Sequence, residues 1–160
     1  MLSMRVGIGY DIHALKKGRK MVLGGVQIPH PEGPFGHSDG DVLFHAIVDA
    51  ALGAAGLGDI GEHFSDRDAR WRDTSGLFFA RRTVALLKKR KLRVAQIDSV
   101  LVMETPKLSP YKKAMCRKIA SAFGIPAAQV NVKGKTNEGL DAVGQRRAIV
   151  AHAVVILEKG

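Results

Sequence analysis

The sequence predicts an α+β domain in which helices pack on one face of a small mixed β-sheet. Strand-like and helix-like segments follow one another in the order β-β-α-α-β-α-β-β, which is typical of that class. The length of 160 residues is the common size of one domain. No repeat, low-complexity tract or long linker divides the chain, so residues 1–160 are expected to form a single domain.

The first third of the chain is expected to hold strands and a loop. Met4–Gly9 and Met21–Ile28 have the apolar, β-branched content of strands. The basic stretch Lys16–Lys20 is expected to join them as a loop. Pro29–His37 is rich in glycine, proline and histidine and follows neither the strand period nor the helix period, which predicts a second loop.

Two helices separated by a polar loop are expected next. Asp41–Ala55 has apolar residues at helical spacing, and Ser38 or Asp39 can cap its N-terminus. Gly56–Asp73 is the polar loop. Ser75–Lys91 is the second helix, and its basic end complements the negative end of the helix dipole. Its inward face is expected to carry Leu77, Phe78, Val84, Ala85 and Leu87.

The remaining segments complete the sheet. Val94–Glu104 alternates in the manner of a strand, and Ser109-Pro110 is a typical helix start for a helix that ends at Gly124. Gln129–Lys133 and Arg147–Glu158 are the last two strands. Long loops are uncommon in compact domains and are usually functional. We therefore expect the functional residues in the two loops that flank the Asp41–Ala55 helix.

The charge of the chain favours an anionic ligand. There are 25 Lys and Arg against 15 Asp and Glu, a net charge of +10, which attracts nucleic acid, an anionic membrane or a phosphorylated small molecule. The basic runs Lys16–Lys20 and Arg81–Arg93 have no interleaved aromatic residues, which argues against nucleic acid. No apolar run is long enough for a membrane helix, and no signal peptide is visible. The single cysteine, Cys116, excludes an internal disulfide and suits the cytoplasm.

Three residues from two motifs form a candidate metal site. Asp11 and His13 are two apart on extended backbone, so their side chains point to the same side. His45 lies on the Asp41–Ala55 helix. Taken singly, the first two are a surface pair or ligands, and His45 is a core residue or a ligand. Together they suit a tetrahedral zinc with an open fourth position. Asp49, one helical turn beyond His45, is a partner for an imidazole or a surface charge.

A second candidate site would hold phosphate. Lys133–Gly139 contains two lysines, a threonine and two glycines after a strand, which predicts either a phosphate cradle or an ordinary polar turn. It lacks the spacing of a P-loop. Glu138 can complete the coordination of magnesium or manganese that bridges phosphates. Met103–Ser109 joins a strand to a helix, where it either receives an anion or a base edge or simply turns the chain.

With these motifs the sequence resembles the 2-C-methyl-D-erythritol 2,4-cyclodiphosphate synthases, from Arg5 to Leu157. The matching stretches are Gly9-Tyr10-Asp11-Ile12-His13, Leu23-Gly24-Gly25-Val26, His37-Ser38-Asp39-Gly40-Asp41-Val42 on to His45, Leu52 to Gly61, Phe64-Ser65-Asp66, Pro106-Lys107, and Asn131-Val132-Lys133 on to Thr136. The resemblance implies a lyase of the non-mevalonate isoprenoid precursor pathway.

The reaction that the resemblance implies is a cyclisation. The 2-phosphate of 4-diphosphocytidyl-2-C-methyl-D-erythritol 2-phosphate attacks the β-phosphate, and the products are 2-C-methyl-D-erythritol 2,4-cyclodiphosphate and CMP. The cofactors would be zinc and a second ion, magnesium or manganese. Residues 1–160 would be one catalytic domain, assembling as a homotrimer with shared active sites. A zinc-dependent phosphohydrolase and a basic nucleotide-binding module remain as alternatives.

The resemblance also implies roles for single residues. The catalytic residues would be His37, Lys135 and Thr136. Zinc would be held by Asp11, His13 and His45, and the second divalent ion by Glu138. The substrate contacts would come from Asp11, His13, His37, Ser38, Asp49, Asp59, Ile60, Gly61, Phe64, Asp66, Asp68, Met103, Pro106, Lys107, Ser109, Lys135, Thr136, Asn137 and Glu138.

One segment departs from the family pattern. After Glu138 the family runs Lys-Leu-Gly-Phe-x-Gly-Arg, whereas this chain has Ala142 at the aromatic position and Gln145 at the arginine position. In the family these two positions line a cavity on the trimer axis that can hold an isoprenoid diphosphate. That accessory ligand is therefore doubtful here, while the zinc and phosphate positions are retained.

Overall fold

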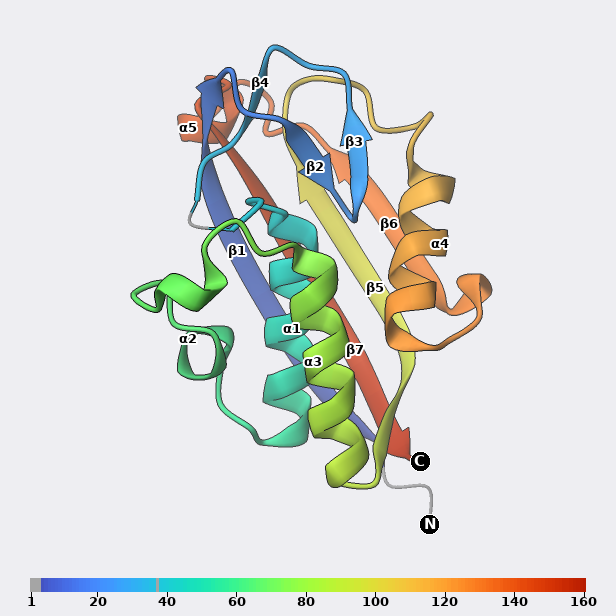
Figure 1. Ribbon diagram of the computed structural model, residues 1–160. Helices are drawn as coiled ribbons and strands as arrows, with labels where there is room; N and C mark the ends of the chain where they lie inside the picture. Colours follow the sequence, from blue (N-terminus) through green and yellow to red (C-terminus); the bar gives the residue numbers. More distant parts are fainter. Residues whose placement is uncertain (1–3, 37) are drawn as a thin grey trace.

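The computed structural model describes residues 4–36 and 38–160, and its centre is a five-stranded mixed sheet (Figure 1). The strand order is β4-β1-β7-β5-β6. Neighbouring strands are antiparallel except β5 and β6, which are parallel, so the predicted mixed sheet is confirmed. The strands are β1 (Arg5–Lys17), β4 (Glu32–Pro34), β5 (Leu92–Val102), β6 (Val130–Lys135) and β7 (Ala148–Lys159).

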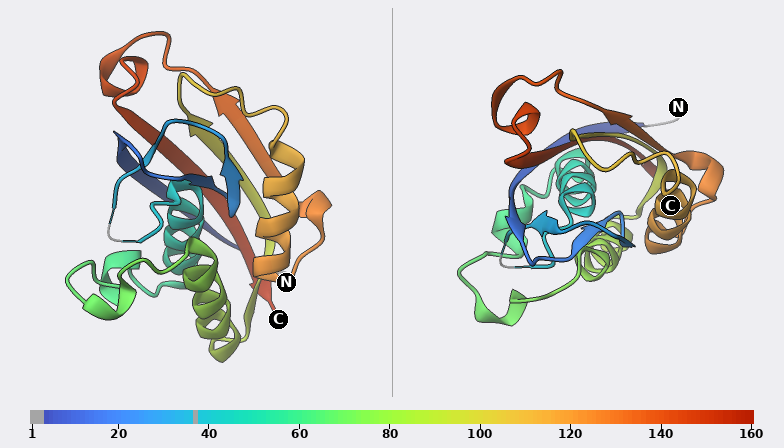
Figure 2. Two further views of the ribbon diagram at one scale, coloured as in Figure 1. Left: turned by 45° about the horizontal axis from the view of Figure 1, so that its top comes forward. Right: turned by 90° about the horizontal axis from the view of Figure 1, so that it is seen from above.

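Three helices cover one face of this sheet, as predicted: α1 (Val42–Ala55), α3 (Gly76–Lys89) and α4 (Lys112–Phe123) (Figure 2). Two glycines of β1 set how closely α1 approaches. A Cβ atom on Gly7 would lie 2.0 Å from the carbonyl oxygen of Ala50, and one on Gly9 would lie 1.9 Å from that of Ala46. Because no side chain separates them, α1 packs directly on the backbone of β1.

The opposite face of the sheet is apolar and largely uncovered at β1. Side chains alternate along a strand, so the residues between Gly7 and Gly9 and their neighbours point away from the helices. Four of them are between 45% and 75% exposed: Val6, Ile8, Tyr10 and Ile12. A contiguous exposed apolar patch of this kind is typical of a surface that another chain covers.

The predicted single strand Met21–Ile28 is wrong, because it is a hairpin of β2 (Met21–Leu23) and β3 (Val26–Ile28). The turn residues Gly24 and Gly25 have φ of 56° and 73°, a left-handed conformation that glycine adopts readily. The loop Pro29–His37 contains β4. The loop Gly56–Asp73 contains two short helices, α2 (Ile60–His63) and η1 (Ala69–Trp71).

Several predicted boundaries also need correction. Strand β1 runs past Gly9 to Lys17, so Asp11 and His13 lie inside it, and the Lys16–Lys20 loop begins within the strand. The N-cap of α1 is Asp41, not Ser38 or Asp39. The Ser109-Pro110 pair forms a turn, and α4 begins at Lys112. The helix end at Gly124 is confirmed, with φ of 69°.

The inward face of α3 differs from the predicted one. Phe78 and Ala85 are exposed, and the buried residues of the helix are Gly76, Phe79, Ala80, Thr83 and Leu87. Relative to the prediction, the buried face of α3 is therefore shifted by about one residue, and Phe79 in place of Phe78 faces α1. The short elements η2 (Ala127–Gln129) and α5 (Asp141–Gly144) complete the fold. Within the described residues, no helix is long and apolar enough to cross a membrane.

Candidate active site

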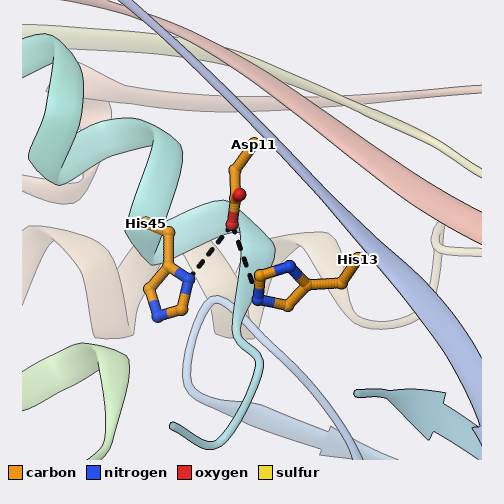
Figure 3. Close-up of side chains that lie close together, drawn as sticks. All are labelled: Asp11, His13 and His45. Carbon is orange, nitrogen blue, oxygen red and sulfur yellow. Dashed lines mark hydrogen bonds and ion pairs between the residues drawn. The ribbon is translucent and has the colours of Figure 1, made fainter. Parts of the chain in front are cut away.

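Asp11, His13 and His45 come together where β1 passes the start of α1 (Figure 3). Asp11 and His13 share the side of β1 that carries Gly7 and Gly9, so they face α1. The close packing of α1 then brings His45 beside them. The Oδ2 atom of Asp11 lies 3.1 Å from Nδ1 of His45 and 3.7 Å from Nε2 of His13. His45 is buried and the other two are half-buried.

Hydrogen bonds fix which nitrogen of each imidazole faces the cluster. Nδ1 of His13 lies 2.7 Å from the carbonyl oxygen of Ile12, an acceptor only, so Nδ1 carries the proton and Nε2 keeps its lone pair. Nε2 of His45 lies 3.1 Å from Oγ of the buried Ser38. Since a hydroxyl either donates or accepts, Ser38 satisfies Nε2 whether or not Nδ1 of His45 holds a metal.

The donor set fits a zinc ion. Ligands about 2.0 Å from a tetrahedral zinc are about 3.3 Å from one another. The two distances from Asp11, 3.1 and 3.7 Å, bracket this value. A carboxylate and two imidazoles leave the fourth position open, which is typical of catalytic zinc. The geometry therefore fits a metal ion held by Asp11, His13 and His45.

Carboxylates around His45 control its charge. Burial acts to lower the pKa of His45, but the hydrogen bond that Asp11 accepts from its ring and the negative charges of Asp11, Asp41 and Asp39 outweigh it, so the pKa is raised. Asp41 is fully buried, and this burial, with the charge of Asp39, raises its pKa to about 6. The Asp41 carboxylate nevertheless accepts the backbone N–H groups of Gly24 (2.9 Å), Gly25 (2.7 Å) and Phe44 (3.1 Å).

A cavity of about 410 Å³ opens beside the three candidate ligands. Of the predicted substrate contacts, it contains Asp11, His13, Ser38, Ile60, Gly61, Phe64 and Asp66. The sequence reasoning missed Gly36, Trp71 and Phe79, which also line it. A Cβ atom on Gly36 would lie 3.2 Å from Nε2 of His13, so a side chain at this position would crowd that donor atom. Of these three residues, Trp71 could have been singled out from the sequence, because it is the single tryptophan of the chain and lies in a polar loop.

Three predicted substrate residues hold the loop around the cavity instead of lining it. Asp49 accepts the N–H of Ile60 (3.0 Å), Asp59 caps α2 by accepting the N–H of Glu62 (2.9 Å), and Asp68 pairs with Arg70 (2.6 Å). The Asp49 carboxylate is thus engaged by the α2 backbone, not by an imidazole. The remaining predicted residue of this region, His37, lies outside the described residues.

A second cavity, of about 330 Å³, lies between the segments that follow β5 and β6. Six predicted residues line it: Met103, Pro106, Lys107, Ser109, Lys135 and Thr136. Glu104, Leu108 and Gly134, which belong to the two predicted segments, line it as well, and so does Lys112, which had not been predicted. The carboxylate of Glu104 accepts the backbone N–H of Asn137 (2.7 Å), which ties the two segments together.

Residues of the Lys133–Gly139 motif make different contacts, and only some of them face the cavity. Thr136 donates its hydroxyl proton to Glu138 (2.9 Å), so the predicted ligand of the second ion lies next to the predicted phosphate-binding threonine. Asn137 and Glu138 do not line the cavity. Lys133 points elsewhere and pairs with Asp98 (2.6 Å), and the ammonium group of Lys133 lowers the pKa of that carboxyl. Of the predicted cradle, Gly134, Lys135 and Thr136 line the cavity, and Lys133 does not.

Among the described residues, the two cavities share no lining residue. Strands β1 and β6, which border them, lie on either side of β7 and β5 (Figure 1). The ligands Asp11 and His13 are on β1, whereas Lys135 ends β6, and strands β7 and β5 lie between. Three strand spacings amount to about 14 Å. The predicted zinc ligands Asp11, His13 and His45 and the cavity lined by Met103 to Thr136 are therefore far apart within one chain.

The segment that departs from the family pattern forms α5. Its Val143 is buried with Ala148 and Val150 of β7, and Ala142 packs against this small cluster. Gln145 is exposed. The aromatic position thus holds Ala142, and the arginine position holds Gln145, with Arg146 following one residue later.

The structure is thus an α+β fold with a possible metal-binding triad beside a cavity. The family model described as the YgbB family matches residues 4–158, so the chain belongs to that family. The 2-C-methyl-D-erythritol 2,4-cyclodiphosphate synthase of Syntrophomonas wolfei is 49% identical over 156 residues, covering 98% of this chain and 99% of that protein. The resemblance seen in the sequence is thereby confirmed.

Solved structures agree with this assignment. The bifunctional IspDF from Campylobacter jejuni has a TM-score of 0.96 and 33% identity and is matched along 100% of this chain, which spans 43% of that longer chain. The CDP complex of IspF from Plasmodium falciparum has a TM-score of 0.86 and 34% identity, with 98% of this chain and 97% of that chain covered.

Proposed function

We propose that this protein converts 4-diphosphocytidyl-2-C-methyl-D-erythritol 2-phosphate to 2-C-methyl-D-erythritol 2,4-cyclodiphosphate and CMP, as a lyase of the non-mevalonate pathway. The observation that carries this proposal is the cluster of Asp11, His13 and His45, with preset imidazole nitrogens, beside a cavity of about 410 Å³. Relatives about half identical along nearly the whole chain bear the name of this synthase.

The reaction forms one P–O bond and breaks another. An oxygen of the 2-phosphate attacks the β-phosphorus, the bond from that phosphorus to the α-phosphate oxygen breaks, and CMP leaves with the electron pair. Because the nucleophile is already an anion, no strong general base is needed. The protein must hold the two ends in line and stabilise negative charge at the transferring group.

The residues of the chain divide this work. A zinc ion held by Asp11, His13 and His45 supplies a Lewis acid for a phosphoryl oxygen. Lys135 contributes a positive charge and Thr136 a hydroxyl donor to the phosphates. Glu138 holds the second ion, magnesium or manganese. Ile60, Gly61, Phe64 and Asp66 surround the erythritol part.

We place the cytidine at the cavity of Met103 to Thr136. Relatives have been solved with CDP bound, which supports a nucleotide ligand for this chain. The cavity is open and partly apolar, with Met103 and Leu108 on its walls and the backbone of Pro106 to Ser109 along its rim. Such a surface fits a small aromatic base with a few polar contacts.

We further propose that the protein is a homotrimer with active sites shared between neighbouring copies. Two observations support this. The exposed apolar face of Val6, Ile8, Tyr10 and Ile12 calls for a partner surface. The separation of the zinc side from the nucleotide side within one chain leaves each half to be completed by another copy. The accessory axial ligand is not part of this proposal, because Ala142 and Gln145 replace the residues that would bind it.

We place the reaction in the cytoplasm, where a lone thiol such as Cys116 stays reduced. Phosphorus NMR tests the reaction directly, with purified protein, zinc, magnesium and the diphosphocytidyl substrate. We expect two mutually coupled signals of a cyclic diphosphate, together with CMP. A linear bisphosphate with CMP would instead indicate a phosphohydrolase. An unchanged substrate spectrum, with bound metal verified, would favour a nucleotide-binding module.

A further inference from the structure

A cavity lined by positively charged side chains lies at one end of the strands, where β1 begins and β7 ends. Its volume is about 300 Å³, within the usual range for small-ligand sites. The register places Arg5 opposite Leu157, and Lys159 opposite Leu92. Three adjacent strands, β1, β7 and β5, therefore have their ends side by side here. The lining residues are Arg5, Arg90, Lys91, Leu92, Lys159 and Gly160.

The four cationic side chains of this cavity lack acidic partners. Within residues 4–36 and 38–160, none of Arg5, Arg90, Lys91 and Lys159 forms an ion pair, whereas the neighbouring Arg93 pairs with Glu158. Among the residues that the structure describes, no carboxylate side chain lines the cavity. A main-chain carboxylate at Gly160 would cancel one of the four charges and leave an excess of three.

The backbone of the α3–β5 turn supports a role for these charges. Lys91 has φ of 55°, a left-handed conformation in which glycine or asparagine is preferred. The N–H of Gly160 donates to the carbonyl oxygen of Lys91 (3.0 Å), so the end of β7 is fixed against this turn. The chain thus carries Lys91 at a position where the backbone conformation favours glycine or asparagine.

The basic cavity is separate from the candidate active site. It shares no lining residue with the cavity of His45 or with that of Thr136. Asp11 lies six residues further along β1 than Arg5, a distance of about 20 Å along an extended strand. The substrate in the proposed reaction therefore does not account for the charge at this end of the strands.

We propose that this cavity binds a small polyphosphate anion, either inorganic pyrophosphate or the terminal diphosphate of a small metabolite. The guanidinium groups of Arg5 and Arg90 can each bind two phosphate oxygens, and the two lysines add point charges. No aromatic side chain lines the cavity and Leu92 is buried, so recognition is directed at the phosphates and not at a base.

Calorimetric titration with inorganic pyrophosphate tests this site, using the full chain treated with EDTA at low salt. We expect Arg90→Gln/Lys91→Gln to weaken binding about tenfold or more, because two charged contacts are removed. The matched control, Arg81→Gln/Lys88→Gln, removes the same charge from exposed positions of α3 that do not line the cavity, and should change affinity less than about twofold. His45→Ala should bind pyrophosphate as the wild type does.

Three results would overturn the site. Equal weakening in both double variants would mean that pyrophosphate responds only to net charge. Loss of binding in His45→Ala, with Arg90→Gln/Lys91→Gln unaffected, would place the anion at the metal ligands. No binding by the wild type at millimolar pyrophosphate would leave the cavity without a ligand of this class. Amide NMR gives an independent readout, since binding should shift the signals of Lys91, Leu92 and Lys159.

Discussion

The two cavities of the proposed active site are built in different ways. The zinc side uses rigid elements: Asp11 and His13 lie within β1, His45 lies on α1, and hydrogen bonds to Ile12 and Ser38 set the imidazole nitrogens. The nucleotide side is formed by the ends of β5 and β6 and the segments that follow, joined by the contact of Glu104 with Asn137. One chain thus carries a preorganised candidate metal site, whereas the nucleotide side is an open surface that a neighbouring copy would complete in the proposed homotrimer.

Removing a zinc ligand should have the largest effect. His45→Ala removes one of three donor atoms, so we expect a loss of metal binding and a fall in CMP release of about a thousandfold, since a Lewis acid contributes several kcal/mol to phosphoryl transfer. Metal content and CMP release are measured on the same preparation. His30→Ala serves as the control, because that ring only bonds the backbone of Glu32. Full activity of His45→Ala would exclude the cluster as a metal site.

The buried Asp41 should make the zinc side pH-sensitive. Its pKa of about 6 in the folded protein lies above the unfolded value near 3.8, so the folded state binds the proton more tightly. The resulting stability is present below about pH 4 and is lost as pH rises through 6, by up to about 3 kcal/mol. We expect Asp41→Asn to remove this decline in urea unfolding of metal-free protein between pH 4 and 7.

Asp98 provides a control of opposite sign. The ammonium of Lys133 lowers the pKa of Asp98, so its contribution is present at higher pH and is lost as pH falls through the lowered value. Asp98→Asn should therefore leave the decline between pH 4 and 6 in place. A wild-type protein whose stability is flat or rises over that range, relative to Asp41→Asn, would contradict the raised pKa.

Ser38 should tune metal affinity through His45. Its hydroxyl is the partner of Nε2, so Ser38→Ala leaves that nitrogen without an orienting contact in a buried setting. Loss of such a contact to a metal-bound histidine costs about 10- to 100-fold in affinity. Zinc affinity is measured by competition with a chelator, apart from any activity. Ser38→Thr keeps the hydroxyl and should restore most of the affinity; equal affinity in all three proteins would exclude the positioning role.

Glu104 should have a smaller effect, confined to the nucleotide side. Glu104→Ala removes the acceptor for the N–H of Asn137 and loosens the loop that carries Lys135 and Thr136. We expect KM to rise about tenfold, the value of one charged hydrogen bond, with zinc affinity unchanged. Glu104→Gln keeps an acceptor oxygen and should show a weaker effect. A change in zinc affinity would mean that the two sides are not independent.

The sequence predicted the zinc side better than its surroundings. Asp11 and His13 could be paired because alternation along a strand is a local rule, and the donor set of one carboxylate and two imidazoles added His45. Asp41 was missed as the N-cap because its burial depends on Gly24 and Gly25, which turn a predicted strand into a hairpin. The contact of Glu104 with Asn137 was missed because the two residues are 33 apart in the sequence, in the segments that follow the parallel strands β5 and β6. Such contacts depend on the sheet order, which local patterns do not determine.

Mixing two inactive variants tests most directly whether the site is shared between copies. His45→Ala damages only the zinc side, and Lys135→Ala/Thr136→Ala damages only the nucleotide side. After the two proteins are unfolded and refolded together in equal amounts, about a quarter of the sites in a cyclic assembly should combine two undamaged sides. We expect CMP release to recover to about that fraction of wild type. A mixture of His45→Ala with Asp11→Asn, both on the zinc side, should stay inactive. No recovery in the first mixture, with exchange of subunits verified, would contradict a site shared between copies.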